Sequence, residues 1–207
     1  MTNARVPDMN KRIQQIRKDD YRRIKSRLRL RLGFKQLINR PYFNVLLIIM
    51  LIPFLVAWNN LDFFLPIKFI PEELLATCYS IVSGLLAIAL ILCELITIRM
   101  IGVFTARNFE KILSIVFSAS YDYECPIMRS CRTDKHNKVT VYEFYSEISK
   151  AKWEDNLESI AEKKNIHFVT PRITYGGKHA NNGKFIKLYT QKGILTPERG
   201  IMHDTEI

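Results

Sequence analysis

The sequence predicts a hairpin of two transmembrane helices followed by a small cytosolic α+β domain. Three observations lead to this prediction: two uncharged apolar stretches, an excess of cations before the first stretch, and alternating strand and helix patterns in the second half of the chain. The chain has 207 residues, a formal net charge of +11 and an isoelectric point near 9.6. This length allows one or two domains, and the charge predicts an anionic partner.

The N-terminal segment, residues 1–40, carries thirteen Lys or Arg residues against three acids. Its composition is helix-forming, with an imperfect apolar stripe. Such a helix beside a membrane segment is expected to lie along an anionic leaflet, where each cation contributes about 1 kcal/mol of attraction. The residues predicted to contact the membrane surface are Arg22, Arg23, Lys25, Arg27, Arg29, Arg31, Lys35 and Arg40.

Nucleic acid is the alternative partner for this basic segment, through contacts to phosphates. The segment has two aromatic residues, Tyr21 and Phe34, and Phe34 is close to the first apolar stretch. A base-stacking platform needs more aromatic rings than this, so the composition favours lipid. Indirect contact with DNA passing near the membrane stays open.

Two stretches without charge, residues 41–61 and 74–93, are each close to the ~20 apolar residues that cross a ~30 Å hydrocarbon core. Tyr42 and Trp58 bracket the first stretch, as interfacial aromatic residues do. The first stretch begins too deep in the chain for a cleaved signal peptide. The predicted helices cover about residues 42–61 and 74–98.

Lysine and arginine predict the orientation of the hairpin. The connection between the helices carries one cation, Lys68, whereas cations crowd the N-terminal segment and recur after the second helix. The positive-inside rule therefore predicts a multi-pass protein of the cell membrane with both termini in the cytoplasm and a short external loop.

Small residues recur at four-residue spacing on the second predicted helix, at Ala76, Ser80 and Gly84. This pattern lets helices approach closely. It predicts a helix-packing face directed either at the first helix or at another subunit.

The second half of the chain predicts an amphipathic connecting helix over 99–120, an α+β domain over 121–192 and a C-terminal linker over 193–207. Residues 139–145 are β-branched and aromatic, as strands are. Ser149 is a candidate N-cap for a helix, and two further strands follow, the first ending or bulging near Pro171. The predicted core residues are Phe144, Trp153, Leu157, Ile160, Ile166 and Phe168.

No pattern in the sequence predicts catalysis, a cofactor or a resident metal. Cys125, Cys131 and His136 resemble a zinc site only loosely, because zinc ligands usually include a closer cysteine pair. The four histidines are scattered, and the loop before Lys184 lacks the serine or threonine that a phosphate-binding loop places after its lysine. The chain is therefore expected not to be an enzyme.

The stretch "YEFYSEISKAKWEDNLESIAEKKNIHFVTPR", together with the basic N-terminus and two membrane helices, resembles the region before the motor in FtsK/SpoIIIE-like DNA translocases of Gram-positive conjugative elements. The resemblance covers nearly all of the chain. The matching residues are Phe144, Trp153, Glu154, Asp155, Leu157, Ile160, Asn165, Ile166 and Phe168.

The resemblance implies ring-forming oligomers, a motor ATPase, transfer proteins and nearby double-stranded DNA. The family's Walker A and Walker B motifs do not occur in this sequence. The expectation is therefore a non-catalytic membrane-anchoring and adaptor portion, either a fragment of a translocase or a separate short protein. A small two-helix membrane regulator or sensor, whose module binds a protein or ligand, is the alternative.

Overall fold

The structure is a computed structural model that describes residues 5–61, 71–120, 123–134, 136–170, 172–177 and 182–193, with only the backbone of 5–10 and 72–73. The chain divides into two compact units. The helical unit is Met1–Asn108 with Ile127–Arg129, and the sheet unit is Phe109–Pro126 with Ser130–Ile207. Most of the predicted external loop and the linker beyond Gly193 lie outside the described residues.

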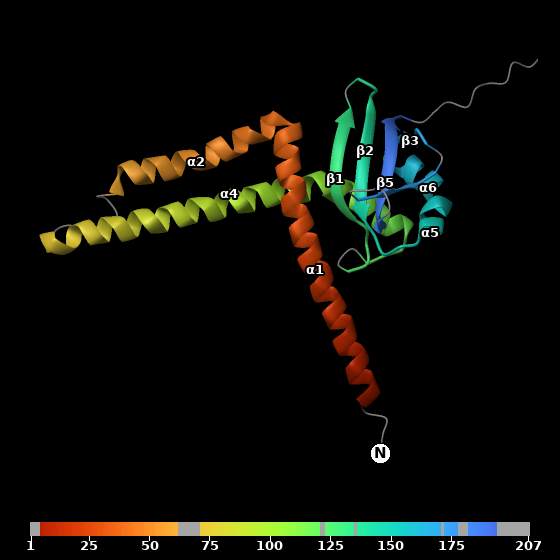
Figure 1. The fold of residues 1–207 in the computed structure, drawn as a ribbon, viewed down its shortest axis with the longest axis horizontal. Coiled ribbons are helices and arrows are strands. Elements are labelled where there is room, and N and C mark those ends of the chain that lie inside the picture. The colour runs from red at the N-terminus through yellow and green to blue at the C-terminus, as the bar shows by residue number, and fades with distance from the viewer. Residues whose placement is uncertain are drawn as a thin grey trace, which may run out of the picture. The chain divides into compact units, whose positions relative to one another are not determined.

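Within its described residues, the helical unit contains three long helices and one short turn of 3₁₀ helix. These elements are α1 (Arg5–Asn39), η1 (Pro41–Phe43), α2 (Asn44–Asn59) and the first part of α4 (Glu72–Val116). Pro41 ends α1, because a proline disfavours helical geometry at the preceding residue, and Arg40 is extended at φ −137° and ψ 83°. Figure 1 shows α2 and the N-terminal part of α4 as the two arms of a hairpin.

Helix α4 is continuous from Glu72 to Val116 and includes both the second predicted membrane helix and most of the connecting helix predicted over 99–120. The physical reason is that no proline interrupts this stretch. The helix stops where Ser118 adopts a left-handed conformation at φ 50° and Ala119 N donates to Ser114 O. This is the usual geometry of a helix C-terminus.

The sheet has five strands in the order β1-β2-β5-β3, with β4 also paired to β5. The strands are β1 (Ile127–Asp134), β2 (Val139–Tyr145), β3 (Ile166–Phe168), β4 (Thr174–Gly176) and β5 (Asn182–Lys192). The β1 strand was missed in the sequence because "IMRSCRTD" is largely polar and lacks a clear β-branched pattern.

The longest strand, β5, pairs antiparallel with three others. β2 lies along one side of β5, and β3 and β4 follow one another along its other side. Phe168 lies opposite Thr190, and Thr174 lies opposite Lys187. The strand predicted over "IHFVTPRIT", with an end or bulge near Pro171, is two short strands with the interruption between Phe168 and Thr174.

Aromatic rings from three elements form the core of the sheet unit. Phe109 of α4 packs edge-on against Phe144 and Tyr142 of β2, with ring centroids 5.1 Å and 4.7 Å apart. Trp153 lies 4.8 Å from Phe117 and 5.7 Å from Phe144 between ring centroids. The end of α4 is thus the central core helix of the sheet unit, which begins at Phe109 and not near residue 121 as predicted.

Of the predicted core residues, Phe144, Trp153, Ile160 and Ile166 are buried. Leu157 and Phe168 are only half-buried, so they lie at the edge of this core.

Two short helices, α5 (Lys150–Asp155) and α6 (Leu157–Lys164), replace the one helix predicted between β2 and β3. Ser149 caps α5 by accepting from Lys152 N at 3.4 Å. Ser146 Oγ accepts from the Trp153 indole N–H at 3.0 Å and from Ile148 N at 3.1 Å, which fixes the corner after β2. Asn165 ends α6 in a left-handed conformation.

Candidate membrane interface

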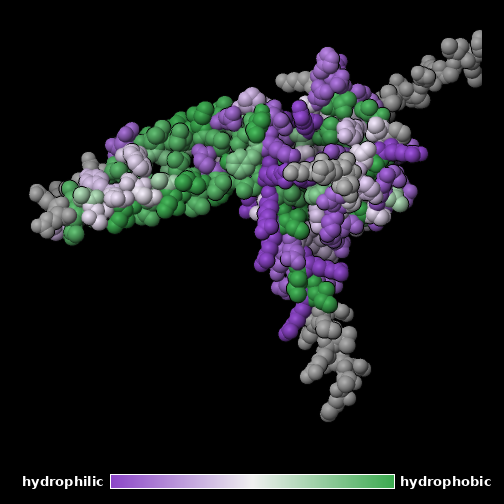
Figure 2. Space-filling model, in the orientation of Figure 1, coloured by the Kyte–Doolittle hydropathy of each residue, from purple (hydrophilic) through white to green (hydrophobic). Residues whose placement is uncertain are grey.

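Two helices in the described part of the chain, Pro41–Asn59 and Leu74–Val116, are long and apolar enough to cross a membrane. The most apolar windows of these helices are 0% and 6% buried, respectively. A core helix of a soluble protein would instead be largely buried, because apolar side chains gain free energy by leaving water. Figure 2 shows the apolar surface concentrated over α2 and the first part of α4.

Aromatic side chains mark the two ends of α2. Tyr42 is 59% exposed and Trp58 is 48% exposed. The Arg40 guanidinium donates to the Tyr42 hydroxyl at 3.2 Å, which pairs a cation with an interfacial ring. At the other end, the Asn60 side chain donates to Val56 O at 2.8 Å and closes the last turn. Polar ends around an apolar middle are the pattern of a bilayer-spanning segment.

Two glycines let α1 and α4 cross with their backbones in contact. A Cβ atom on Gly33 would collide with the carbonyl oxygen of Ile98, and one on Gly102 would collide with the carbonyl oxygen of Arg29. Both contacts lie within the helical unit. The crossing sits beyond the apolar part of α4, at the level where the predicted membrane segment ends. Sequence reasoning missed it, because the two glycines are far apart in the chain.

The exposed face of α1 is cationic beyond this crossing. Arg23, Arg27 and Arg31 recur at intervals of four residues, so they lie on one face of the helix, and all three are exposed. Ile16, 61% exposed, lies on the same side of α1 one heptad before Arg23. A helix with arginines and an exposed isoleucine on one side suits the boundary between headgroups and acyl chains.

The structure corrects one predicted surface contact. Arg29 is 3% exposed, because it lies where Gly102 brings α4 against α1, and it is therefore not on the lipid-accessible face. Arg22 is exposed like the three arginines above, whereas Lys25, Lys35 and Arg40 are half-buried.

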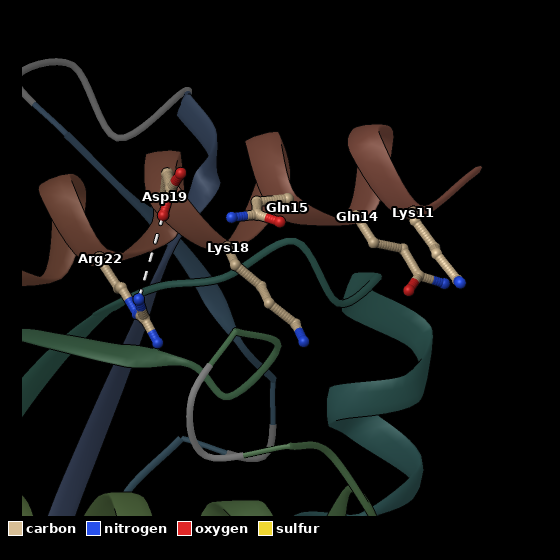
Figure 3. A pocket seen from close by; sticks show the side chains of 6 residues that line it. All are labelled: Lys11, Gln14, Gln15, Lys18, Asp19 and Arg22. Atoms are coloured by element: carbon tan, nitrogen blue, oxygen red, sulfur yellow. Dashed lines mark ion pairs between the residues drawn. The ribbon is translucent and has the colours of Figure 1, made fainter. Parts of the chain in front are cut away.

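A second, wholly polar face of α1 is lined by residues at helical spacing (Figure 3). On this face Arg22 forms an ion pair with Asp19 at 4.0 Å, between two exposed side chains. An exposed pair of this kind contributes little stability. The residues on this face are Lys11, Gln14, Gln15, Lys18, Asp19 and Arg22.

The predicted small-residue face of α4 is exposed at all three positions, Ala76, Ser80 and Gly84. A Cβ atom at Gly84 would meet nothing within 4 Å. The close contact between α1 and α4 uses Gly33 and Gly102, and packing of the small-residue face on another subunit stays a prediction.

The sheet unit brings the loosely patterned cysteines into its interior. Cys125 and Cys131 are buried and are not joined in a disulfide, and the Cys125 thiol donates to Glu110 O at 3.2 Å. His136 lies in the turn after β1, where its backbone N–H donates to Asp134 at 3.0 Å. Among the described residues, no three His, Cys, Asp or Glu side chains gather as a metal site would require.

Two titratable groups of the sheet unit have shifted pKa values. Hydrogen bonds from His136 N and the Asn137 side chain lower the pKa of Asp134 below 3.8. Burial lowers the pKa of Lys164, whose ammonium lies 5.3 Å from the centre of the Phe109 ring. Both shifts therefore have local structural causes: hydrogen bonds for Asp134 and burial for Lys164.

These observations define a helical hairpin of membrane-spanning length joined to a small antiparallel sheet unit. No family model and no curated protein matches the chain. A solved structure, the pCW3 conjugation coupling protein TcpA in its monomer form with ATPγS, is similar with a TM-score of 0.34 and 18% identity. The match covers 42% of this chain and 24% of that chain, and a similarity of this degree carries no functional argument.

Proposed function

We propose that the chain is the membrane-anchoring and adaptor portion of an FtsK/SpoIIIE-like conjugative DNA translocation system, and that it is not catalytic by itself. The observation that carries this proposal is the continuity of α4, which joins an exposed apolar segment to the aromatic core of the sheet unit. A helix that continues from an apolar segment into a folded module attaches that module directly to the segment. The conjugative setting rests on the sequence resemblance.

In this proposal α2 and the first part of α4 span the cell membrane, with both termini in the cytoplasm. The cations of α1 and those after the second apolar stretch support this orientation through the positive-inside rule. The sheet unit then docks on a motor ATPase, on transfer proteins or on sibling subunits.

Anionic lipid is the proposed partner of α1. In nanodiscs, trypsin should cleave after Arg23, Arg27 and Arg31 more slowly when the lipid is anionic than when it is zwitterionic, because headgroups then cover these side chains. Added salt should remove the protection. The matched control is Lys152 of α5, an exposed cation whose cleavage should not depend on lipid charge. Equal cleavage of α1 in both lipids would contradict the lipid contact.

The adaptor role is tested by affinity purification of the tagged chain from native membranes. Recovery of a motor ATPase together with transfer proteins is the expected result. Recovery of signalling proteins without a motor would favour a small membrane regulator or sensor instead. A variant with Arg at Gly84, on the exposed face of α4, would show whether sibling subunits meet there, because a charge in the bilayer opposes helix association.

A further inference from the structure

A chain of hydrogen bonds joins three strands at the C-terminal end of β5. Gln191 of β5 lies opposite His167 of β3 in the antiparallel ladder. The Nε2 atom of the His167 ring lies 2.9 Å from Gln191 Oε1, and its Nδ1 atom lies 2.9 Å from the Gly193 carbonyl oxygen. The Gln191 side-chain amide also donates to Asn137 O, in the turn between β1 and β2, at 3.3 Å. The name "clasp" is used below for Asn137, His167, Gln191 and Gly193.

Backbone geometry places Gly193 against the histidine ring. Gly193 has a φ of 94°, a left-handed conformation that glycine adopts without steric cost. Its N–H donates to Asn165 O at 3.0 Å, at the point where α6 ends and β3 follows. The Gly193 carbonyl meets the ring of His167, two residues beyond Asn165. The residue that follows β5 is therefore held at both of its backbone groups by the β3 segment.

Both partners of the ring can only accept hydrogen bonds. A backbone carbonyl oxygen and the oxygen of an amide side chain carry no proton to donate. A neutral imidazole has one N–H group, so it would serve either Gly193 O or Gln191 Oε1 and turn a lone pair toward the other oxygen. An imidazolium has an N–H group at each nitrogen and donates to both. The clasp is therefore complete only when His167 is protonated at both nitrogens.

The orientation of the Gln191 amide is fixed by its second partner. Its nitrogen donates to the Asn137 carbonyl oxygen, which leaves Oε1 directed at His167. The reversed orientation would give the ring a donor, but it would set Gln191 Oε1 against the Asn137 oxygen, and two acceptors cannot bond. The bond to Asn137 therefore favours the arrangement that requires the imidazolium.

Charged groups on the strands beside His167 do not pair with it. Among the described residues, His167 forms no ion pair. Because side chains alternate along β5, Tyr189 and, farther along, Lys187 lie on the same side of the sheet as the ring, whereas Lys192 points to the other side. Glu143 of β2 lies opposite Lys187 in the ladder and not opposite a clasp residue.

The last turn of α6 and the turn between β1 and β2 also carry titratable groups close to the clasp. In the described part of the chain these are Glu162, Lys163, Lys164, Asp134, His136 and Lys138. All except Lys164 are exposed, and the Lys164 ammonium lies at the Phe109 ring, on the opposite face of the sheet. Exposed charges act weakly on one another through water, whereas a hydrogen bond from a charged donor is about twice as strong as one between neutral groups. The two bonds at 2.9 Å therefore outweigh the surrounding charges.

We propose that the clasp is a proton-dependent switch that holds the end of β5 to β3 when His167 is an imidazolium and loosens when the ring is neutral. Loss of the proton leaves either Gly193 O or Gln191 Oε1 without its donor. The folded form binds this proton more readily than the unfolded chain, so its stabilisation is present below the ordinary histidine range, about 6.5, and is lost as the pH rises through that range. The proposal concerns the sheet unit alone and does not depend on the membrane-anchoring role.

The test is thermal unfolding of the full chain in detergent micelles at about pH 5.5 and about pH 8, on either side of the histidine range. Trp153 fluorescence in a Trp58→Phe background reports the unfolding of the sheet unit. The midpoint should be about 4–8 °C lower at the higher pH, as loss of one hydrogen bond from a small unit produces. In His167→Gln this difference should disappear, because glutamine does not titrate.

Matched variants separate the clasp from other titrating groups. His136→Gln removes an exposed histidine whose backbone N–H, and not its ring, forms the observed hydrogen bond, and it should keep the full difference. Gln191→Leu removes one of the two acceptors, so the neutral ring satisfies the remaining one and the difference should shrink. Gln191→Glu supplies a charged acceptor and should move the fall in midpoint to higher pH.

Hydrogen exchange of residues 189–193 provides a local readout. At about pH 5.5 this segment should exchange faster in His167→Gln than in the parent protein, and at about pH 8 the two should exchange alike. Long-range proton–nitrogen NMR spectra, with the His167 signals assigned by their absence from His167→Gln, show directly whether one or both ring nitrogens are protonated.

Three outcomes would overturn the proposal. One is a midpoint that stays level or rises between the two pH values in the parent protein. Another is a difference that persists undiminished in His167→Gln, or in Gln191→Leu should the histidine variant fail to fold. The third is an NMR spectrum in which the His167 ring of the folded protein is neutral at about pH 5.5.

Discussion

Trp153 connects the layers of the sheet unit. Trp153 is fully buried, contacts rings from α4 and β2, and donates its indole N–H to Ser146. It therefore joins the helix layer to the sheet through both packing and a buried hydrogen bond. Exposed pairs such as Lys150 with Glu154, 3.5 Å apart, contribute far less.

Trp153→Ala should destabilise the sheet unit by about 3–5 kcal/mol, because a large buried ring is replaced by a cavity. The measurement is urea-dependent labelling of Cys125 and Cys131 in the full chain in micelles, with Cys78 and Cys93 changed to Ala. Trp153→Phe, which keeps an aromatic ring, should cost less. Equal urea midpoints for all three proteins would show that Trp153 is not central to the core.

The lowered pKa of Asp134 predicts that the stability of the sheet unit depends on pH. Its pKa is lower in the folded chain than its ordinary value of 3.8, because His136 N and Asn137 donate to the carboxylate. The stabilisation is therefore present above pH 3.8 and is lost as the pH falls through the lower folded value. Trp153 fluorescence in a Trp58→Phe background would follow thermal unfolding, and Asp134→Ala should flatten the acid limb of the curve.

At the scale of helices and strands, local sequence patterns predicted some elements and not others. Ser149 and the β2 strand could be predicted, because capping chemistry and β-branched composition act over a few residues. The break at Asn156 could not be predicted, since an uninterrupted helical stripe runs through it. The crossing at Gly33 and Gly102 could not be predicted either, because it depends on two segments that meet only in the folded chain.

The crossing of α1 and α4 at Gly33 and Gly102 predicts that glycine-to-alanine variants will differ in stability according to position. Gly33→Ala and Gly102→Ala should each cost about 1–3 kcal/mol, because the added methyl group meets backbone of the facing helix. Gly84→Ala, with open space around it, should instead favour the helix by roughly 0.5–1 kcal/mol.

Hydrogen exchange of the α1 amides, followed by mass spectrometry in micelles, separates these cases. Exchange around residues 29–36 should accelerate in Gly33→Ala and Gly102→Ala and stay unchanged in Gly84→Ala. If all three variants exchange alike, α1 and α4 do not touch at these glycines.

At the scale of the whole molecule, the sequence contains the signals for two apolar helices and for an α+β module, since composition and periodicity determine both. The N-terminal boundary of the module could not be predicted from the sequence, because Phe109 and Phe117 lie in a helix that begins as an apolar segment. Their role is visible only once β2 and α5 are placed around them.

Leu86→Arg tests the membrane-spanning role of α4. The substitution should raise the cost of inserting this helix by about 2.5–3.5 kcal/mol. The fraction of the chain that resists carbonate extraction should fall accordingly. Thr174→Arg, at an exposed strand position of the sheet unit, is the control and should leave that fraction unchanged. Unaltered extraction of the Leu86→Arg protein would count against a spanning helix.

The last turns of α4 have a practical consequence for anyone who wishes to excise a soluble fragment. Phe109 and Phe117 fill the interior of the sheet unit, so a fragment beginning after Val116 would keep Phe117 but lose Phe109, and would uncover the Phe144 ring. Such a truncation should aggregate on expression. A fragment that starts upstream of Phe109 retains the rings and is the one to crystallise.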